Sequence, residues 1–402
     1  MDASGASYAT GFFASDTFYT GGLTLINPVQ GGAFNSTEQM FLAKYDASGN
    51  AEWAVWAGGD RSDRGLGLDL DGQGNVYVCG YFRDSAQFGG TWYVGGGGYN
   101  FFLAKYDPSG NFLWVRHDES NPESQARTVA VDNAGNAYVG GHFVNDISIG
   151  GMTIPALDGN RNGFIAKFET NGDFLWMERI PALILHTTNS SGLAALDLTD
   201  DEQHLAVVGT FRGTTKFGPN QQIQLTSYGP VLDGHFLAYY DTTGVPQWAK
   251  AMNELTTGTS NGPLMADMEI NSNNDIYFTG TIGQVIDFDG TQYHPDTSQG
   301  LHTEVFLAKF SSAGNLDFVN MWGGPDMDEG HALAIDDQDN VYLTGVWEEV
   351  ITMGNTTFPF GNPSLFLART DPMGNVDWAF GDQLAITSSW GLAAGGGNNK
   401  TN

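Results

Sequence analysis

Acidic residues supply most of the side chains in this 402-residue chain that could do chemistry. Asp and Glu number 46 against 16 Lys and Arg, and the formal net charge is −30. Several oxygen ligands suit a hard cation such as Ca²⁺. We expect most of these acids to be solvated, so we predict that the chain binds no cofactor. The alternative is that some of the acids bind Ca²⁺. The acids that could bind it lie in four polar segments, at Asp63, Glu123, Asp328 and Glu329, and at Asp287 and Asp289 beside His294.

Catalytic motifs are missing from the sequence. The 8 histidines show no H-E-x-x-H or H-x-H spacing, and no G-x-S-x-G or phosphate-binding glycine loop occurs. Because the chain contains 46 acidic residues, a pair of carboxylates is not evidence for acid and base catalysis. We therefore predict no catalytic residue.

Two short phrases recur along the chain and predict the elements that would hold any site. The first phrase is FLAKYDASGNAEW at 41–53, and it returns at 102–114, 164–176, 236–248, 306–318 and 366–378. The second resembles GNVYVCGYF at 74–82 and carries one recurring glycine. Its six copies place that residue at Gly11, Gly80, Gly141, Gly209, Gly280 and Gly345.

Each repeat predicts four short strands, A to D in chain order. Val, Tyr, Phe and Leu fill the strands, and D-x-x-G-N punctuates them, because Asp starts a turn and Gly accepts a positive φ. Six such units, each of ~67 residues, predict an all-β, six-bladed β-propeller with four-stranded blades. A stack of β-sandwich modules is less favoured, since a sandwich needs roughly 100 residues.

We expect residues 1–402 to form one propeller domain. The chain begins inside a blade, so a strand A near its C-terminal end should pair with strands B, C and D near its start and leave no open edge. The predicted blades are 2–59 plus 388–397, 64–116, 126–179, 192–251, 264–321 and 330–381.

Four tryptophans have no equivalent in most repeats: Trp92, Trp322, Trp347 and Trp390. Exposed aromatic side chains stack on sugars or anchor protein partners. We take these four as candidate ligand-binding residues, and the alternative is that they fill the seams between blades.

The repeat resembles the SBBP β-propeller repeats of bacterial secreted and cell-surface proteins. The resemblance rests on D-x-x-G-N-x-Y-V-x-G-Y, on F-L-A-K-Y-D-x-x-G-N-x-x-W and on W-x-G-G at 56–59, with the shorter W-G-G at 322–324. That family is labelled as seven-bladed, whereas this chain has six repeats. The resemblance implies an extracellular or bacterial cell-surface location and a binding or structural role, and it transfers no functional residue.

Composition limits the partners. A chain this acidic lacks the basic footprint that nucleic acid binding needs. The sequence contains no apolar run of 18 residues, so no membrane span is predicted. It also lacks a basic N-terminal region followed by an apolar one, so no signal peptide is predicted.

Function is predicted to reside on one end of the blades. The A–B and C–D turns are short and uniform, whereas the B–C and D–A connections are long and vary. A rigid scaffold that presents variable loops favours a non-enzymatic binding or adhesion module for a protein or glycan. The alternatives are a lyase or glycoside hydrolase at the channel mouth, and a structural block that contacts other domains or copies of itself.

Overall fold

The computed structural model describes residues 2, 4–28, 37–120, 123–156, 161–183, 192–218, 220–228, 233–255, 264–295 and 303–382. The chain is all-β, and the predicted six-bladed β-propeller fold class is confirmed. Because the described residues form no helix, none of them offers a helix that could cross a membrane. Two compact units are present, Met1–Leu185 and Ala194–Thr401, with residues 186–193 and 402 divided between them.

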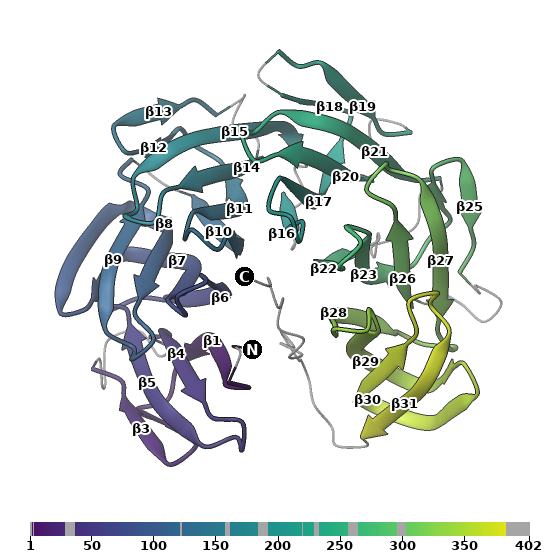
Figure 1. Cartoon of the computed structure of the whole chain (residues 1–402), viewed down its shortest axis with the longest axis horizontal. Coiled ribbons are helices and arrows are strands. Elements are labelled where there is room, and N and C mark those ends of the chain that lie inside the picture. The colour runs from purple at the N-terminus through teal and green to yellow at the C-terminus, as the bar shows by residue number, and fades with distance from the viewer. Residues whose placement is uncertain are drawn as a thin grey trace. The chain divides into compact units, whose positions relative to one another are not determined.

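The first unit contains three blades (Figure 1). Blade 1 shows three strands in the order β1-β4-β5, and the expected fourth, near 388–397, lies outside the described residues. Blades 2 and 3 each show four, in the orders β6-β7-β8-β9 and β10-β11-β14-β15. The strands are β1 (Ser7–Phe13), β4 (Gln39–Tyr45), β5 (Ala51–Ala57), β6 (Arg64–Leu70), β7 (Val76–Phe88), β8 (Thr91–Tyr106), β9 (Phe112–His117), β10 (Ser124–Val131), β11 (Ala137–Phe143), β14 (Arg161–Phe168) and β15 (Phe174–Leu183).

The second unit contains the other three blades (Figure 1). Their strand orders are β16-β17-β20-β21, β22-β23-β26-β27 and β28-β29-β30-β31, and the strand pairs β17–β20, β22–β23 and β28–β29 are antiparallel. The strands are β16 (Leu193–Leu198), β17 (His204–Arg212), β20 (Asp233–Asp241), β21 (Pro246–Glu254), β22 (Leu264–Ile270), β23 (Ile276–Ile282), β26 (Glu304–Phe310), β27 (Leu316–Trp322), β28 (Glu329–Ile335), β29 (Val341–Met353), β30 (Thr356–Thr370) and β31 (Val376–Asp382).

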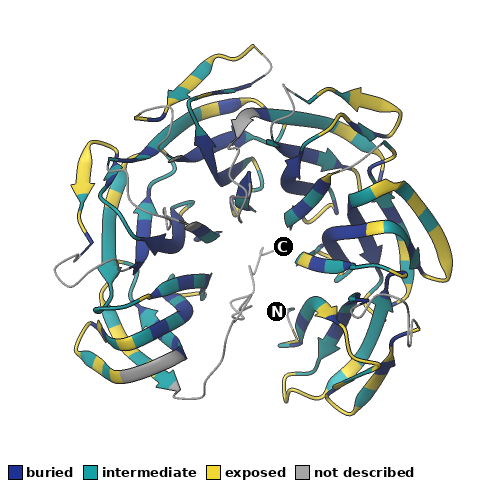
Figure 2. Ribbon diagram, turned by 180° about the vertical axis from the view of Figure 1, so that it is seen from behind, coloured by how far each residue is buried: buried dark blue, intermediate teal, exposed yellow. Residues whose placement is uncertain are grey.

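Small hairpins extend from the B–C connections. Their exposed segments stand out beside the buried strands B and C of the blades (Figure 2). One of them pairs with β21 of blade 4, so that blade gains two strands. The hairpin strands are β2 (Thr17–Thr20), β3 (Leu23–Ile26), β12 (Ile147–Ile149), β13 (Met152–Ile154), β18 (Thr214–Phe217), β19 (Ile223–Thr226), β24 (Ile286–Phe288) and β25 (Thr291–Tyr293).

The turn mechanism predicted for D-x-x-G-N is confirmed. The Gly74 N–H donates to the Asp71 carbonyl at 2.9 Å, and the Asn75 N–H donates to Asp71 Oδ1 at 2.8 Å. Asn271 makes the same contacts through its amide oxygen, since the Asp275 N–H donates to Asn271 Oδ1 at 2.8 Å. An acceptor oxygen two to four residues before the donors is what this turn requires.

The recurring tryptophan of strand D joins consecutive blades. Trp53 Nε1 donates to the Pro108 carbonyl at 3.0 Å, and Trp248 Nε1 donates to the Ser312 carbonyl at 2.9 Å. Both carbonyls belong to the C–D turn of the next blade. This tryptophan is therefore a packing residue whose polar end is also satisfied.

The recurring glycine of strand B faces a bulge in strand A. Gly65 and Gly67 of β6 pair with the consecutive residues Gly80 and Cys79, so Leu66 is an extra residue without a partner. The same skip occurs opposite Gly141, Gly280 and Gly345. A Cβ on Gly80 would collide with the Arg64 carbonyl, and one on Gly141 or Gly345 would meet the equivalent carbonyl. Glycine is required here because the bulged backbone approaches so closely.

Replacing this glycine should disrupt its blade. We expect Gly80→Ala to cost about 3 kcal/mol of the free energy of unfolding, because the backbone must move to accept the methyl group. The matched control is Gly72→Ala in an exposed turn, where the Cβ would come no closer than 3.0 Å to an Asn133 side-chain atom. Guanidinium unfolding of both variants measures the difference, and equal midpoints would contradict the role of the bulge.

Candidate functional site

The candidate site lies at the B–C end of blades 2 and 3, where strand B leads into the B–C connection and strand A begins. In blade 2, Tyr81 of β7 pairs with Arg64 of β6. In blade 3, His142 of β11 pairs with Gln125 of β10 on one side and with Gly163 of β14 on the other. Both Tyr81 and His142 directly follow the recurring glycine, so the bulge positions them.

Arg64 is fully paired in this region. Its Nε and Nη2 atoms donate to the two carboxylate oxygens of Glu38, both at 2.7 Å, and its guanidinium lies 4.1 Å from the Phe12 ring centroid. Two parallel bonds of this kind are the strong form of an ion pair. The pair holds blade 2 against blade 1 and leaves neither charge available for a ligand.

Arg127 contrasts with Arg64. It is the extra residue of the bulge in β10, between Ala126 and Thr128. Among the described residues, no hydrogen bond or ion pair satisfies its guanidinium. Burial and the charge of Arg161 lower the pKa of Arg127. An unpaired, partly desolvated guanidinium is costly unless it serves a ligand.

His142 lies beside these arginines and is 3% exposed. Its Nδ1 atom is buried and has no hydrogen-bond partner. Burial first, and then the charges of Arg161 and Arg127, hold the pKa of His142 well below its usual range. The imidazole is therefore neutral at pH 7, with one nitrogen able to donate.

Tyr81 adds a hydroxyl near the same group. Its ring packs edge to face with Tyr99 at 5.0 Å, and its hydroxyl has no hydrogen-bond partner in the part of the chain described. Burial raises the pKa of Tyr81 to about 12. Tyr81 of blade 2 and Arg127, His142 and Arg161 of blade 3 are here called the blade 3 cluster.

The acids predicted as calcium ligands have protein partners in the structure. Asp63 Oδ2 accepts from the Gly59 N–H at 2.6 Å and its Oδ1 accepts from the Arg83 N–H at 2.9 Å. Asp328 accepts from the Gly324 N–H at 2.7 Å and from the Glu348 N–H at 3.3 Å. Each carboxylate is buried and joins the end of one blade to the next blade. Each of their four oxygens already accepts one backbone N–H.

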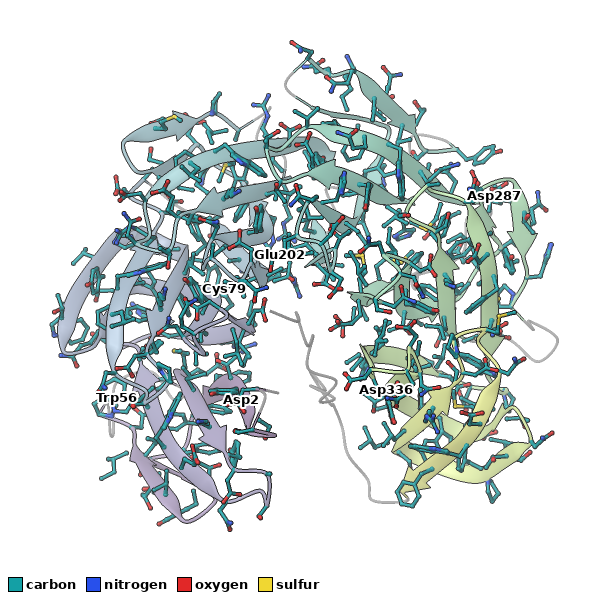
Figure 3. All side chains as sticks on the ribbon, viewed as in Figure 1. Asp2, Trp56, Cys79, Glu202, Asp287 and Asp336 are labelled. Carbon is teal, nitrogen blue, oxygen red and sulfur yellow. The ribbon has the colours of Figure 1, made fainter. Side chains whose placement is uncertain are left out.

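The other four acids predicted as calcium ligands each interact with a different group. The Glu123 charge raises the pKa of Arg161 and therefore acts on the blade 3 cluster. Glu329 Oε2 lies 3.0 Å from His331 Nε2, and Asp289 pairs with Lys250 at 2.9 Å. Asp287 lies on β24 at the outer hairpin (Figure 3) and accepts from the Gly290 N–H. The described residues contain no group of three His, Cys, Asp or Glu that could hold a metal ion.

The four tryptophans also differ in environment. Trp92 of β8 is 55% exposed. Trp322 is partly buried against a hydrophobic cluster, and Trp347 belongs to that cluster at 1% exposure, 5.3 Å from the Phe358 ring. Trp390 lies outside the described residues. Only Trp92 presents a large aromatic surface to solvent among the three whose positions are described.

The blade 3 cluster was not predicted from the sequence, although a signal for it exists. The residue after each recurring glycine changes along the chain: Phe12, Tyr81, His142, Thr210, Thr281 and Val346. The bulge residue also changes, as Leu66, Arg127, Ala266 and His331. Variation inside an otherwise constant phrase would have identified the first set. The bulge itself is visible only in the pairing register.

Comparisons with known proteins agree with a repeat protein. No protein-family model matches the chain. A WD repeat-containing protein of Acanthamoeba polyphaga mimivirus is 30% identical over 148 residues, which cover 33% of this chain and 10% of that relative. The chain thus corresponds to a small part of this relative.

Solved structures similar to the chain include three enzymes. Kuenenia stuttgartiensis hydrazine synthase gives a TM-score of 0.41 at 11% identity, covering 80% of this chain and 79% of that one. A Synechocystis apocarotenoid oxygenase gives a TM-score of 0.40 at 9% identity, covering 95% of this chain and 78% of that one. An exotype rhamnogalacturonan lyase gives a TM-score of 0.27 at 12% identity, covering 94% of this chain and 70% of that one. With every score below 0.5, these likenesses say nothing about activity.

The buried acids make stability depend on pH. Burial raises the pKa of Asp328 to about 8 and that of Asp267 to about 7, above the usual 3.8. The folded state therefore binds more protons than the unfolded state between about pH 4 and 8, so stability falls as pH rises through this window. We expect a lower melting temperature at pH 8.5 than at pH 6.

Substitution of one acid tests this assignment. Asp328→Asn should reduce the change in melting temperature between pH 6 and 8.5, and should lower stability at pH 6 because one backbone N–H loses its acceptor. The control Asp46→Asn changes a half-buried C–D turn residue whose Oδ1 accepts from the Asn50 N–H, a contact that Asn271 makes with its amide oxygen in an A–B turn, and it should keep the full pH dependence. Identical pH profiles for both variants would rule out the role of Asp328.

Proposed function

We propose that this chain is a non-enzymatic binding module that recognises a protein partner through the B–C end of its blades. The observation that carries the proposal is the difference between the two ends of each blade. The A–B and C–D turns repeat one set of hydrogen bonds, for example at Asp46, Asp71 and Asp107. The B–C end carries hairpins and side chains that change from blade to blade. Repetition at one end and variation at the other is typical of a scaffold with a recognition surface.

The exposed side chains of blade 2 favour a protein partner. Trp92 and Val94 lie two residues apart on β8 and therefore on one face of that strand, and they are 55% and 73% exposed. Tryptophan is enriched among the residues that dominate protein interfaces. An adjacent aromatic and aliphatic pair suits a protein surface better than a sugar ring, which needs the aromatic face together with several hydrogen bonds.

The acids close to the cluster argue for binding over glycoside hydrolysis. A glycosidase needs two available carboxyl groups roughly 5–10 Å apart. Glu38 is committed to Arg64, and both oxygens of Asp63 accept backbone N–H groups. Asp63 is 1% exposed and the Glu38 side chain 14%, so neither carboxyl lies open to a sugar.

The cellular setting is part of the proposal. We place the module outside the cell or on a bacterial cell surface, as one member of the SBBP-type repeat proteins. The supporting observations are the similarity of both repeated phrases to that family and the net charge of −30. Labelling of intact cells with an antibody against the chain would test this location, and labelling only after lysis would reject it.

Partner capture tests the proposed surface. The immobilised chain is exposed to a cell-surface protein extract, and the bound proteins are identified by mass spectrometry. Trp92→Ala should lose about 2 kcal/mol of binding free energy, since interface tryptophans commonly contribute this much. Met373→Ala, which removes a 73% exposed side chain from a C–D turn, should bind normally.

Two results would overturn the proposal. Equal capture by both variants would remove the B–C end from recognition. A glycan array that shows binding dependent on Trp92, with no protein retained, would replace the protein partner with a sugar.

A further inference from the structure

We propose that the outer face of the blade 2 hairpin binds a segment of a protein partner that carries one carboxylate beside apolar side chains. The hairpin consists of the end of β7 and the start of β8. Its outer face, here called the blade 2 hairpin face, contains Arg83, Trp92, Val94 and Tyr99. Arg83 pairs with the carboxylate, and Trp92 and Val94 cover the apolar side chains. This inference rests on the proposed function, because it names the chemistry of the partner that the B–C end recognises.

Strand register places these side chains on one face. Directly paired residues of antiparallel strands project to the same side of the sheet. The pairs that join β7 to β8 in this part of the hairpin include Arg83–Tyr99, Ser85–Val94 and Gln87–Trp92. The two strands therefore supply neighbouring positions of a single surface.

The opposite face of the hairpin is buried. Phe82 and Ala86, on either side of the unpaired residue Asp84, belong to one buried hydrophobic cluster, and Phe88 belongs to it too. Side chains of a strand alternate between its two faces, so the residues between these three project away from the cluster. Arg83 is accordingly exposed.

Arg83 carries a charge that no acid among the described residues compensates. Its guanidinium lies 5.5 Å from the ring centroid of Tyr99, and it makes no hydrogen bond or ion pair in the part of the chain that the structure describes. The neighbouring acid Asp84 pairs with Arg61 at 3.2 Å. Both oxygens of Asp63 accept backbone N–H groups. The positive charge of Arg83 is therefore available to an acid of a partner.

Aromatic rings hold the Arg83 guanidinium in place. Tyr99, over which it lies, packs edge to face with Tyr81 at 5.0 Å, and Tyr81 is only 8% exposed. A guanidinium over an aromatic ring can still present its N–H groups to the two oxygens of a carboxylate. Because the side chain is already ordered, less entropy is lost when it pairs with a ligand.

Trp92 and Val94 supply the apolar part of the blade 2 hairpin face. They are 55% and 73% exposed. The Trp92 ring also lies against the backbone of blade 1, since a Cβ added to Gly59 would stand 3.4 Å from Trp92 Cζ3. An exposed ring that is supported from below offers a large contact area at a low cost in conformational entropy.

The charge of the whole chain restricts the partner segment. The formal net charge is −30, so a segment with several acids is repelled at long range. A single carboxylate is matched by Arg83, and its apolar neighbours are matched by Trp92 and Val94. Charge complementarity at this face therefore selects an apolar segment with one acid.

The test selects short random peptides, displayed on phage, against the immobilised full chain, and calorimetry then measures the affinity of the enriched peptides. We expect the enriched peptides to contain one Asp or Glu among apolar residues. Enrichment of no peptide, of peptides without an acid, or of peptides with clustered acids would overturn the inference. Binding of sugars that contain uronic acid on a glycan array, if it depends on Arg83 and no peptide is enriched, would assign the face to an acidic sugar instead.

Matched variants identify the contacts. Arg83→Gln should weaken binding of an enriched peptide about tenfold, as expected for a lost charge-assisted hydrogen bond. Arg83→Glu should prefer the same peptide with Lys in place of its acid, a reversal that a direct contact produces and a structural role does not. Arg179→Gln removes the same charge from the outer strand of blade 3, where Arg179 donates to the Pro155 carbonyl, and should bind the original peptide normally. An unchanged peptide preference in Arg83→Glu would contradict the proposed pairing.

Stability and partner capture separate this inference from the proposed function. The melting temperature of Arg83→Gln should equal that of the unmodified chain, because an exposed side chain without an ion pair is changed. Weaker peptide binding together with a lower melting temperature would indicate a structural role for Arg83 and overturn the inference. Equal partner capture by Arg83→Gln and the unmodified chain rejects only this inference, whereas a lack of capture by the unmodified chain rejects the proposed function.

Discussion

The close approach of a strand B glycine to the bulged backbone of strand A is the constraint on which the blades depend. At Gly80, Gly141 and Gly345 a single methyl group would strike a carbonyl oxygen of the neighbouring strand. The bulge adds one residue to strand A and thereby frees a side chain from the sheet. Both the register of the blade and the direction of Arg127 follow from this contact.

Electrostatic groups hold the blades together in two different ways. At the A–B end, lysines of strand C bind the turn acids, as in the Lys105–Asp71 pair at 3.2 Å, and lie over tyrosine rings such as Tyr77. At the B–C end, buried Asp63 and Asp328 accept backbone N–H groups without a cation. The first arrangement keeps its charges compensated, whereas the second favours protonated acids and makes the junctions sensitive to pH.

Blades 2 and 3 show how repeats with one backbone differ in their side chains. Blades 2 and 3 share the same strands, glycine and bulge, yet blade 2 carries Leu66 at the bulge and blade 3 carries Arg127. Tyr81 and His142 likewise occupy one repeat position. Because the backbone is constant, a change of side chain alone makes the ends of these two blades different.

The sequence by itself determined the number of repeats, the strand composition, the Asp–Gly turns and hence the six-bladed fold, because these depend on residues close together along the chain. It also identified the B–C end as the variable one. Tertiary structure decided which polar residues share a site: it buried Trp347 and turned Asp63 and Asp328 into backbone acceptors. It also placed Arg127 at a bulge opposite the strand that carries His142. Pairing register and a one-residue bulge govern these contacts, and neither leaves a local pattern in the sequence.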